Sequence, residues 1–239
     1  MLRRRAACLV LVSLALPALA SAEGDAKAEP ARGELATVAV PGDRSVYVVH
    51  GAPGDRRVLL YLHGRCGDPH AGIRAFAREV SERGTLISVP ADIPCPNRKG
   101  RTHWTADMVR VEARIEAAIQ AVSGTRSVPL DTSARTVIGY SEGALRAESL
   151  AARSPDKYPH VVLLASPRAP KPGFTRSQRV ALGVGENDVQ GDMREGAAAI
   201  QRSGVPSRLF VLPRASHGHY GPEGGRVMAE AFSWLFDTG

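Results

Sequence analysis

Short apolar runs alternate with helical patterns along most of this chain, and this alternation most strongly limits how it can fold. Continuous apolar runs bounded by turn signals predict strands that are covered on both faces of a sheet. Strands that alternate with helices form a mainly parallel sheet with right-handed crossovers. We therefore expect a single α/β domain with eight strands, at 35–40, 45–49, 58–62, 85–89, 136–140, 161–165, 180–184 and 208–212.

Turn and helix signals lie between these runs. Pro41-Gly42-Asp43 separates the first two strands and predicts an antiparallel hairpin. Asp68 followed by Pro69 predicts a helix start, and an apolar spacing of three or four residues continues from there to Gly84. A proline-rich loop is expected up to Arg101. Further helices are expected over 104–122, 144–151 and 192–202 and from Pro222 onward.

The first 22 residues have the layout of a secretory signal peptide. Three arginines at positions 3–5 precede an apolar run over 6–16, and small residues offer cleavage sites after Ala20 or Ala22. The apolar run is shorter than the roughly 20 residues of a membrane span, so no membrane anchor is expected. Residues 1–22 are thus a predicted signal peptide, 23–33 a flexible lead-in and 34–239 the folded domain, in a protein exported to the periplasm or secreted.

Removal of the signal peptide leaves a mild positive charge. The full chain has a net charge of +7, and loss of three arginines gives 7 − 3 = +4. Only 5% of the residues are aromatic, and no basic stripe with interleaved aromatics is present, so nucleic acid is not an expected partner. A composition that is 44% hydrophobic and 23% charged also excludes a disordered chain.

Two cysteines remain after export, Cys66 and Cys95, because Cys8 lies within the signal peptide. An even pair in an oxidising compartment predicts a disulfide. Two buried free thiols, or a metal-binding pair, are the alternatives that the sequence leaves open.

Polar residues follow several of the predicted strands, at the sheet edge where α/β proteins bind ligands. The strand at 136–140 is followed by Ser141, the strand at 180–184 by Asp188, and the strand at 208–212 by His217. Residues 139–143, Gly-Tyr-Ser-Glu-Gly, match the pattern G-x-S-x-G, in which a sharp strand-to-helix turn exposes the serine hydroxyl. The motif alone is a weak signal, but here a strand pattern precedes it and a helical pattern follows it.

Together these features resemble the α/β-hydrolase fold family over nearly the whole chain from about residue 35 to 236. The resemblance is carried by His63-Gly64, the 139–143 motif, Asp188 and His217. Small members without a lid domain, the dienelactone-hydrolase-like and carboxylesterase or thioesterase groups, are most similar. Their catalytic histidine follows glycine, whereas Ser216 stands there in this chain.

The resemblance implies acyl transfer to water through a Ser141–His217–Asp188 triad. The oxyanion hole would use the backbone N–H of Glu142 and that of Arg65 or Cys66. His219 is the alternative base. Glu186 and Asp192 are the alternative acids. His63 is expected to fix its own loop, while His50, His70, His103 and His160 are expected on the surface.

The substrate is expected to be a small ester or an acyl group on a carrier. The segment 166–178 has no room for a helical lid, which predicts an open site. A basic rim could attract anionic substrates; its expected members are Arg65, Arg98, Lys99, Arg101, Arg168 and Lys171. A peptidase or amidase, and a non-catalytic binding protein, are the alternatives. No cofactor or metal is expected, because the sequence contains no phosphate loop, dinucleotide fingerprint or metal-ligand cluster.

Overall fold

A computed structural model describes residues 29–237, so the predicted signal peptide lies outside the described residues. Eight strands form one sheet in the order β1-β2-β4-β3-β7-β8-β9-β10. This arrangement confirms the predicted α/β fold class and the number of strands in the main sheet. The strands are β1 (Leu35–Val38), β2 (Val46–Val49), β3 (Val58–Leu62), β4 (Thr85–Val89), β7 (Arg135–Tyr140), β8 (His160–Leu164), β9 (Arg179–Gly185) and β10 (Ser207–Leu212).

The sheet is parallel except at one side. β1 pairs antiparallel with β2, as predicted for a hairpin, and β2 pairs antiparallel with β4. All other neighbours in the sheet are parallel. The carboxyl ends of β3, β4, β7, β8, β9 and β10 therefore meet at the same edge, which we call the carboxyl edge.

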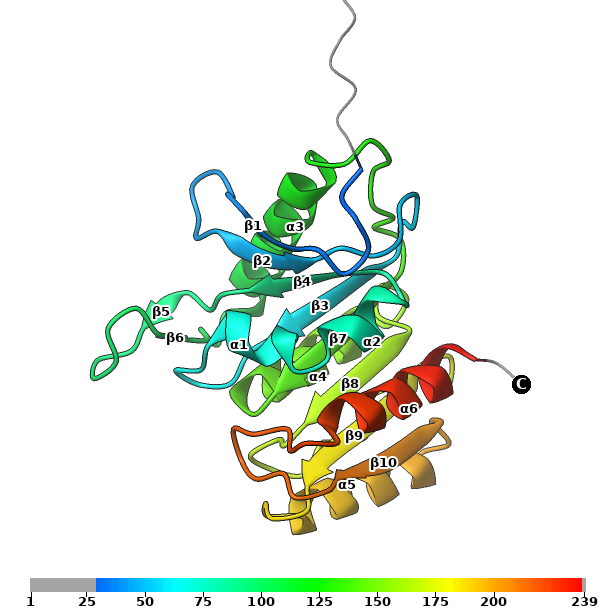
Figure 1. The fold of residues 1–239 in the computed structure, drawn as a ribbon. Helices are drawn as coiled ribbons and strands as arrows, with labels where there is room; N and C mark the ends of the chain where they lie inside the picture. Colours follow the sequence, from blue (N-terminus) through cyan, green and yellow to red (C-terminus); the bar gives the residue numbers. More distant parts are fainter. Residues whose placement is uncertain (1–28, 238–239) are drawn as a thin grey trace, which may run out of the picture.

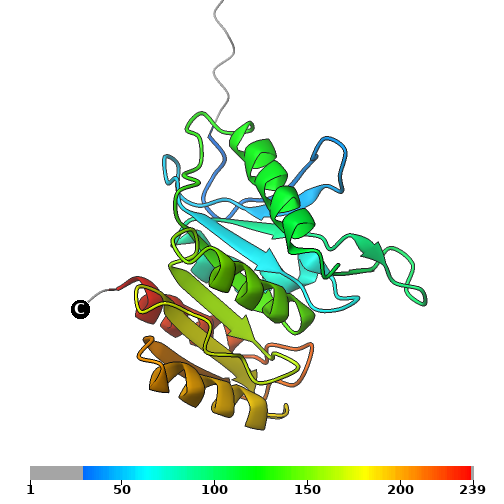
Figure 2. The ribbon, with the colours of Figure 1, turned by 180° about the vertical axis from the view of Figure 1, so that it is seen from behind.

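Helices cover both faces of the sheet. α1, α2 and α6 lie on one face (Figure 1), and α3, α4 and α5 lie on the other (Figure 2). Each face has its own apolar core because successive side chains of a buried strand point to opposite sides. The helices are α1 (Pro69–Arg74), α2 (Ala77–Ser81), α3 (Met108–Ser123), α4 (Glu142–Arg153), α5 (Gly191–Arg202) and α6 (Gly224–Phe236).

Three elements differ from the sequence-based expectation. The helix predicted from Pro69 is divided into α1 and α2 at Phe76, whose backbone leaves the helical region (φ −142°, ψ 29°) while its ring packs against Tyr61. The expected proline-rich loop contains two strands of two residues each, β5 (Ile93–Pro94) and β6 (Thr102–His103), which pair with each other. We call residues 93–103 the arm; it projects beyond the carboxyl edge (Figure 1).

The third difference concerns Trp104, which lies outside α3 although it continues the apolar stripe of that helix. Asp107 caps α3 by accepting hydrogen bonds from the backbone N–H groups of Val109 and Arg110, and this cap sets the helix start at Met108. Sequence analysis also placed His50 on the surface, but it is buried, with 3% of its surface exposed. The chain at Gly33 and Glu34 covers it, through backbone hydrogen bonds to His50 of 2.7 and 3.0 Å.

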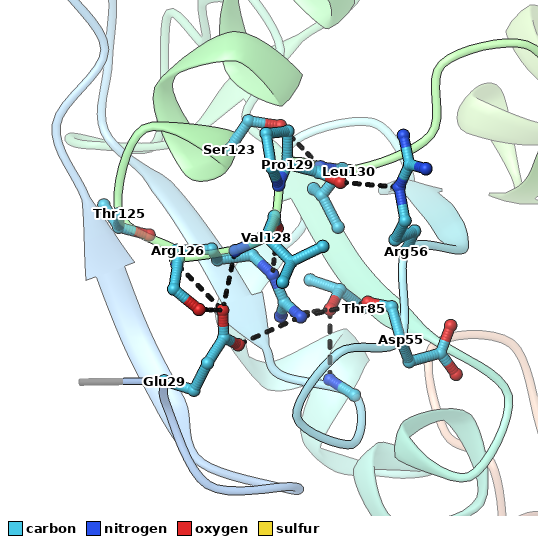
Figure 3. Close-up of polar contacts among 12 residues, drawn as sticks. Glu29, Asp55, Arg56, Thr85, Ser123, Thr125, Arg126, Val128, Pro129 and Leu130 are labelled. Carbon is cyan, nitrogen blue, oxygen red and sulfur yellow. Dashed lines mark hydrogen bonds and ion pairs between the residues drawn. The ribbon is translucent and has the colours of Figure 1, made fainter. Parts of the chain in front are cut away.

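A buried arginine holds the start of the described chain to the domain (Figure 3). The Arg126 guanidinium donates to Thr85 Oγ1 (3.1 Å) and to the carbonyl of Asp55 (2.9 Å), and its Nη2 lies 3.2 Å from Glu29 Oε2. Glu29 also accepts hydrogen bonds from Ser127, which hold the pKa of its carboxyl below the usual value. Residue 29 is therefore fixed at the edge opposite the carboxyl edge, where strand β4 begins. Over residues 29–237, none of the helices has the length and apolar character needed to cross a membrane.

Candidate active site

Ser141 occupies a sharp turn between β7 and α4, at the carboxyl edge. Its backbone has φ 53° and ψ −118°, a conformation that side-chain-bearing residues rarely adopt. The turn needs the two flanking glycines because a Cβ on Gly139 would lie 2.4 Å from the carbonyl oxygen of Gly143. A Cβ on Gly143 would lie 1.9 Å from the carbonyl oxygen of Leu62. The G-x-S-x-G spacing thus reflects backbone packing between β3, β7 and α4.

Three side chains that are distant in sequence form a continuous hydrogen-bonded chain at this edge. His217 Nε2 lies 3.1 Å from Ser141 Oγ, and His217 Nδ1 lies 2.9 Å from Asp188 Oδ2. Ser141 follows β7, Asp188 follows β9 and His217 follows β10, so all three lie at the carboxyl edge of the sheet. The Asp188 side chain is largely covered (12% exposed), whereas the His217 ring is half exposed.

The alternative residues occupy other places. Glu186 accepts a hydrogen bond from the backbone N–H of Arg214, 2.8 Å away. Asp192 lies in α5 and lines a small hollow on the far side of His217. His219 lines the cleft beside Ser141, but among residues 29–237 its ring makes no hydrogen bond to Ser141 or Asp188. The geometry therefore favours Asp188 and His217 over these alternatives.

The structure distinguishes the two candidates for the second oxyanion donor. The backbone N–H of Cys66 already donates to the carbonyl of Thr102, at 2.9 Å. Within the described part of the chain, the N–H groups of Arg65 and Glu142 donate to no protein acceptor. Arg65 and Ser141 line the same cleft. Arg65 and Glu142 therefore have the free donors that an oxyanion hole requires.

His63 fixes the loop after β3, as sequence analysis predicts. Its Nε2 accepts a hydrogen bond from the backbone N–H of Ala91 (2.9 Å), and its Nδ1 lies 2.8 Å from the carbonyl oxygen of Gly64. With Nε2 accepting, Nδ1 holds the proton and donates it to Gly64. Burial lowers the pKa of His63 to about 4, because the charged imidazolium would be desolvated there.

Trp104, for which the sequence predicts no role in the site, also supports it. The Trp104 indole Nε1 donates to the carbonyl of His63 (2.7 Å), and the Trp104 backbone N–H donates to Glu142 Oε2 (3.1 Å). Trp104 thus joins the loop after β3 to the first residue of α4. The signal for this position was present in the sequence: Asp107 is a helix N-cap residue, so a bulky aromatic before it falls outside the helix.

Tyrosines line the cleft next to Ser141. The cleft has a volume of about 920 Å³, and Tyr61, Tyr140 and Tyr220 contribute to its wall. The Tyr140 hydroxyl accepts a hydrogen bond from the backbone N–H of Gly218, the residue after His217, and burial raises the pKa of Tyr140. Tyr61 and Tyr220 share a hydrogen bond of 2.9 Å between their hydroxyls. No sequence pattern indicated these contacts.

The remaining predictions on the cleft concern its cover and its rim. Residues 165–178, between β8 and β9, contain no helix, so no lid is built from them. Of the six expected rim cations, Arg65 and Arg98 line the cleft. Arg168 instead lies 3.0 Å from the buried carboxylate of Glu148. Among residues 29–237, no group of three or more His, Cys, Asp or Glu side chains is placed to hold a metal ion.

The two cysteines lie where the arm meets the loop after β3. Their Sγ atoms are 1.96 Å apart and their Cα atoms 5.9 Å apart, the separation of a disulfide pair. Cys95 also donates its backbone N–H to the carbonyl of Arg101 (2.9 Å). The contact between the two sulfur atoms holds the arm next to Arg65.

The sheet order, the turn at Ser141 and the positions of the loops define the α/β-hydrolase fold. Solved structures with this fold match over most of the chain. The dienelactone hydrolase of Anabaena variabilis is 20% identical, with a TM-score of 0.59, and the match covers 85% of this chain and 95% of that one. A carboxylesterase of Bacillus cereus is 19% identical, with a TM-score of 0.57 and coverage of 80% and 94%.

A third structure, the fluorophosphonate-binding serine hydrolase F of Staphylococcus aureus, is 13% identical, with a TM-score of 0.58 and coverage of 81% and 92%. No protein-family model matches the sequence, and no curated protein matches it either. At these identities the likeness shows the fold, so the function is argued from the site.

Proposed function

We propose that this protein is a serine hydrolase that cleaves carboxylic esters or thioesters through an acyl-enzyme intermediate. The observation that carries the proposal is the hydrogen-bonded chain from Ser141 Oγ through His217 to Asp188. A serine is activated as a nucleophile when its hydroxyl is hydrogen-bonded to an imidazole whose other nitrogen is hydrogen-bonded to a carboxylate. The three solved structures named above, all hydrolases by their descriptions, support the same reaction class.

In the first half of the reaction, Ser141 Oγ attacks the carbonyl carbon and its proton passes to His217 Nε2. Asp188 holds the Nδ1–H tautomer and stabilises the imidazolium. The N–H groups of Arg65 and Glu142 stabilise the negative charge that develops on the carbonyl oxygen in the transition state and the tetrahedral intermediate. The bond to the leaving oxygen or sulfur then breaks, and His217 returns the proton to that atom.

In the second half, water attacks the acyl-enzyme. His217 takes a proton from the water, the bond between the acyl carbon and Ser141 Oγ breaks, and the proton returns to Ser141. The products are a carboxylic acid and a free enzyme. The open cleft, without a lid between β8 and β9, suits small esters or acyl groups attached to larger carriers.

A fluorophosphonate probe tests the nucleophile directly. The wild type should be labelled, and Ser141→Ala should not. Hydrolysis of p-nitrophenyl acetate or butyrate should fall about 10⁴-fold or more in kcat for Ser141→Ala, and about 10³- to 10⁴-fold for Asp188→Asn. Thermal unfolding of each variant is the control for folding. Labelling that persists in Ser141→Ala would show that another residue reacts and would end the proposal.

A second panel of substrates separates esters from amides. The wild type should cleave p-nitrophenyl esters and matched thioesters, while anilides with the same acyl group should react at least about 100-fold more slowly. Faster cleavage of anilides would make the protein an amidase or peptidase. Labelling by the probe without turnover of either class would indicate a binding protein with a residual nucleophile.

We further propose that the protein is exported to the periplasm or secreted. The layout of residues 1–22 and the sulfur contact between Cys66 and Cys95 support this proposal. Expressed from the full sequence in a bacterium, the mature chain should begin at Ser21 or Glu23. After denaturation without reductant it should contain no reactive thiol, and after reduction two. A chain that still begins at residue 1 would contradict export. Two reactive thiols before reduction would contradict the disulfide.

A further inference from the structure

A second hollow, of about 350 Å³, lies beside the cleft that contains Ser141. Asp68 lines both spaces, and Arg98 of the cleft is followed in the chain by Lys99 of the hollow. Two segments form most of the wall of the hollow, and Asp68, Pro69 and Pro90 complete it. Residues 44–47 at the start of β2 form one, and residues 99–102 of the arm form the other.

The side chains around the two spaces are strongly unbalanced in charge. Five cations line them, Arg44, Arg65, Arg98, Lys99 and Arg101, against a single acid other than the triad, Asp68. The formal sum is 5 − 1 = +4. Arg101 is paired with Asp68, at 3.0 Å. Within residues 29–237 the other four cations form no ion pair. The hydroxyls of Ser45 and Tyr47 add further donors to the hollow, and neither is bonded to protein in the described part of the chain.

The segments that hold these cations are fixed by specific contacts. Asp43, next to Arg44, accepts two hydrogen bonds from Arg114 of α3, at 2.6 and 2.8 Å. The arm is held by the contact of Cys95 with Cys66 and by the pairing of β5 with β6. The backbones that carry the cations are therefore held next to the hollow in the free protein. Part of the electrostatic cost of placing like charges near one another is thus met when the protein folds rather than when a ligand binds.

We propose that this hollow is a subsite for an anionic group of the substrate, a carboxylate or a phosphate, when the ester bond lies at Ser141. Arg44 and Lys99 are its main contacts, and Arg65 and Arg98 lead from the reacting carbonyl toward it. The inference rests on the proposed hydrolase function and narrows its substrate class to esters with a negative charge distant from the carbonyl, since β4 and β3 lie between β2 and β7 in the sheet. The anionic group belongs to the acyl chain or to the alcohol, and the experiment distinguishes these two sources.

The test uses the double variant Arg44→Gln/Lys99→Gln and three esters. Ethyl butyrate is neutral, monoethyl sebacate has a carboxylate at the far end of its acyl chain, and 8-phosphooctyl butyrate has a phosphate at the far end of its alcohol chain. The matched control is Arg153→Gln/Arg202→Gln. These two exposed arginines end α4 and α5, away from the carboxyl edge, and form no ion pair among residues 29–237. Acid release is followed in a pH-stat at low salt.

For one of the two charged esters, the double variant should raise KM roughly 2- to 30-fold and leave kcat within about twofold. Added salt should raise KM for that ester in the wild type by a similar factor. Ethyl butyrate and the control variant should show neither effect. An effect on monoethyl sebacate places the anion on the acyl side, and an effect on 8-phosphooctyl butyrate places it on the alcohol side.

Equal KM values for charged esters in the wild type and the double variant would overturn the subsite. A second result would also overturn the subsite. In that case the fluorophosphonate probe labels Ser141 of the wild type, but neither charged ester is hydrolysed and neither slows the labelling. A wild type that is not labelled at all would instead overturn the proposed function, so the two failures are distinct.

Discussion

At the scale of single residues, the site depends on polar groups that are buried in one defined protonation state. His63 is the clearest case, since it is 1% exposed and lies one residue from Gly64, which packs against Ser141. Only the neutral imidazole can both accept from Ala91 and donate to Gly64. The loop that presents Arg65 is therefore formed with an uncharged His63.

This requirement predicts a loss of stability in mild acid. The pKa of His63 is about 4 in the folded protein and about 6.5 when unfolded. Between these values the unfolded chain binds a proton that the folded chain does not. The contribution of neutral His63 to the free energy of unfolding is thus fully present above about pH 6.5. It is lost as the pH falls toward 4, which lowers the free energy of unfolding by on the order of 3 kcal/mol.

The variant His63→Gln checks this prediction, because glutamine can form hydrogen bonds but does not titrate. Urea unfolding at several pH values between 7.5 and 4.5 should show a smaller fall in the free energy of unfolding for the variant than for the wild type. The other titrating groups are shared by both proteins and cancel in the difference. If the free energy of unfolding falls equally with pH in both proteins, His63 is not the cause of the loss of stability in acid.

At the scale of elements, the strands and the Ser141 turn were predictable because each has a local signal. Buried strands show continuous apolar runs, and the turn shows two glycines at a fixed spacing around serine. β5 and β6 were not predictable, since strands of two residues have no periodicity and their pairing depends on the contact of Cys95 with Cys66. The division of α1 from α2 at Phe76 was missed because packing against Tyr61, rather than helix propensity, determines it.

The turn also predicts which glycines tolerate a methyl group. In Gly143→Ala, the added Cβ would overlap the carbonyl oxygen of Leu62, which belongs to a central strand and cannot move away. We expect a loss of about 3 kcal/mol or more, seen as a melting temperature lower by roughly 10 °C or as failure to fold. Gly191→Ala, at the first position of α5, meets no atom within 4 Å and should change stability by less than about 0.5 kcal/mol. Similar melting temperatures for the two variants would contradict this account.

At the scale of the whole molecule, the fold and the meeting of Ser141, Asp188 and His217 at one edge could be anticipated, because parallel strands bring their carboxyl ends together. The tyrosines of the cleft, the bridge formed by Trp104 and the contact that occupies the Cys66 N–H could not. These features depend on contacts such as that of the Cys66 N–H with Thr102, which lies 36 residues further along the chain in the arm. Sequence patterns do not encode such separations.

The open cleft leads to a prediction about kinetics. Since residues 165–178 form no helical lid, entry of substrate requires no lid to open at an oil–water boundary. For esters such as p-nitrophenyl butyrate or tributyrin, the rate should saturate smoothly as the concentration passes the solubility limit. Ser141→Ala measures the background. An abrupt rise in rate above that limit would show that another segment covers the cleft.

The order of strands in the sheet separates chemistry from recognition. The side chains of the proposed triad follow β7, β9 and β10, whereas the cations beside the cleft all precede residue 102 and come from loops around β2, β3 and β4. The triad and the cations of the hollow therefore lie in different loops. A lineage, or a designer, could vary the loop before β2 and the tip of the arm and alter which molecules are accepted, while the triad and the loop that holds Arg65 are inherited unchanged.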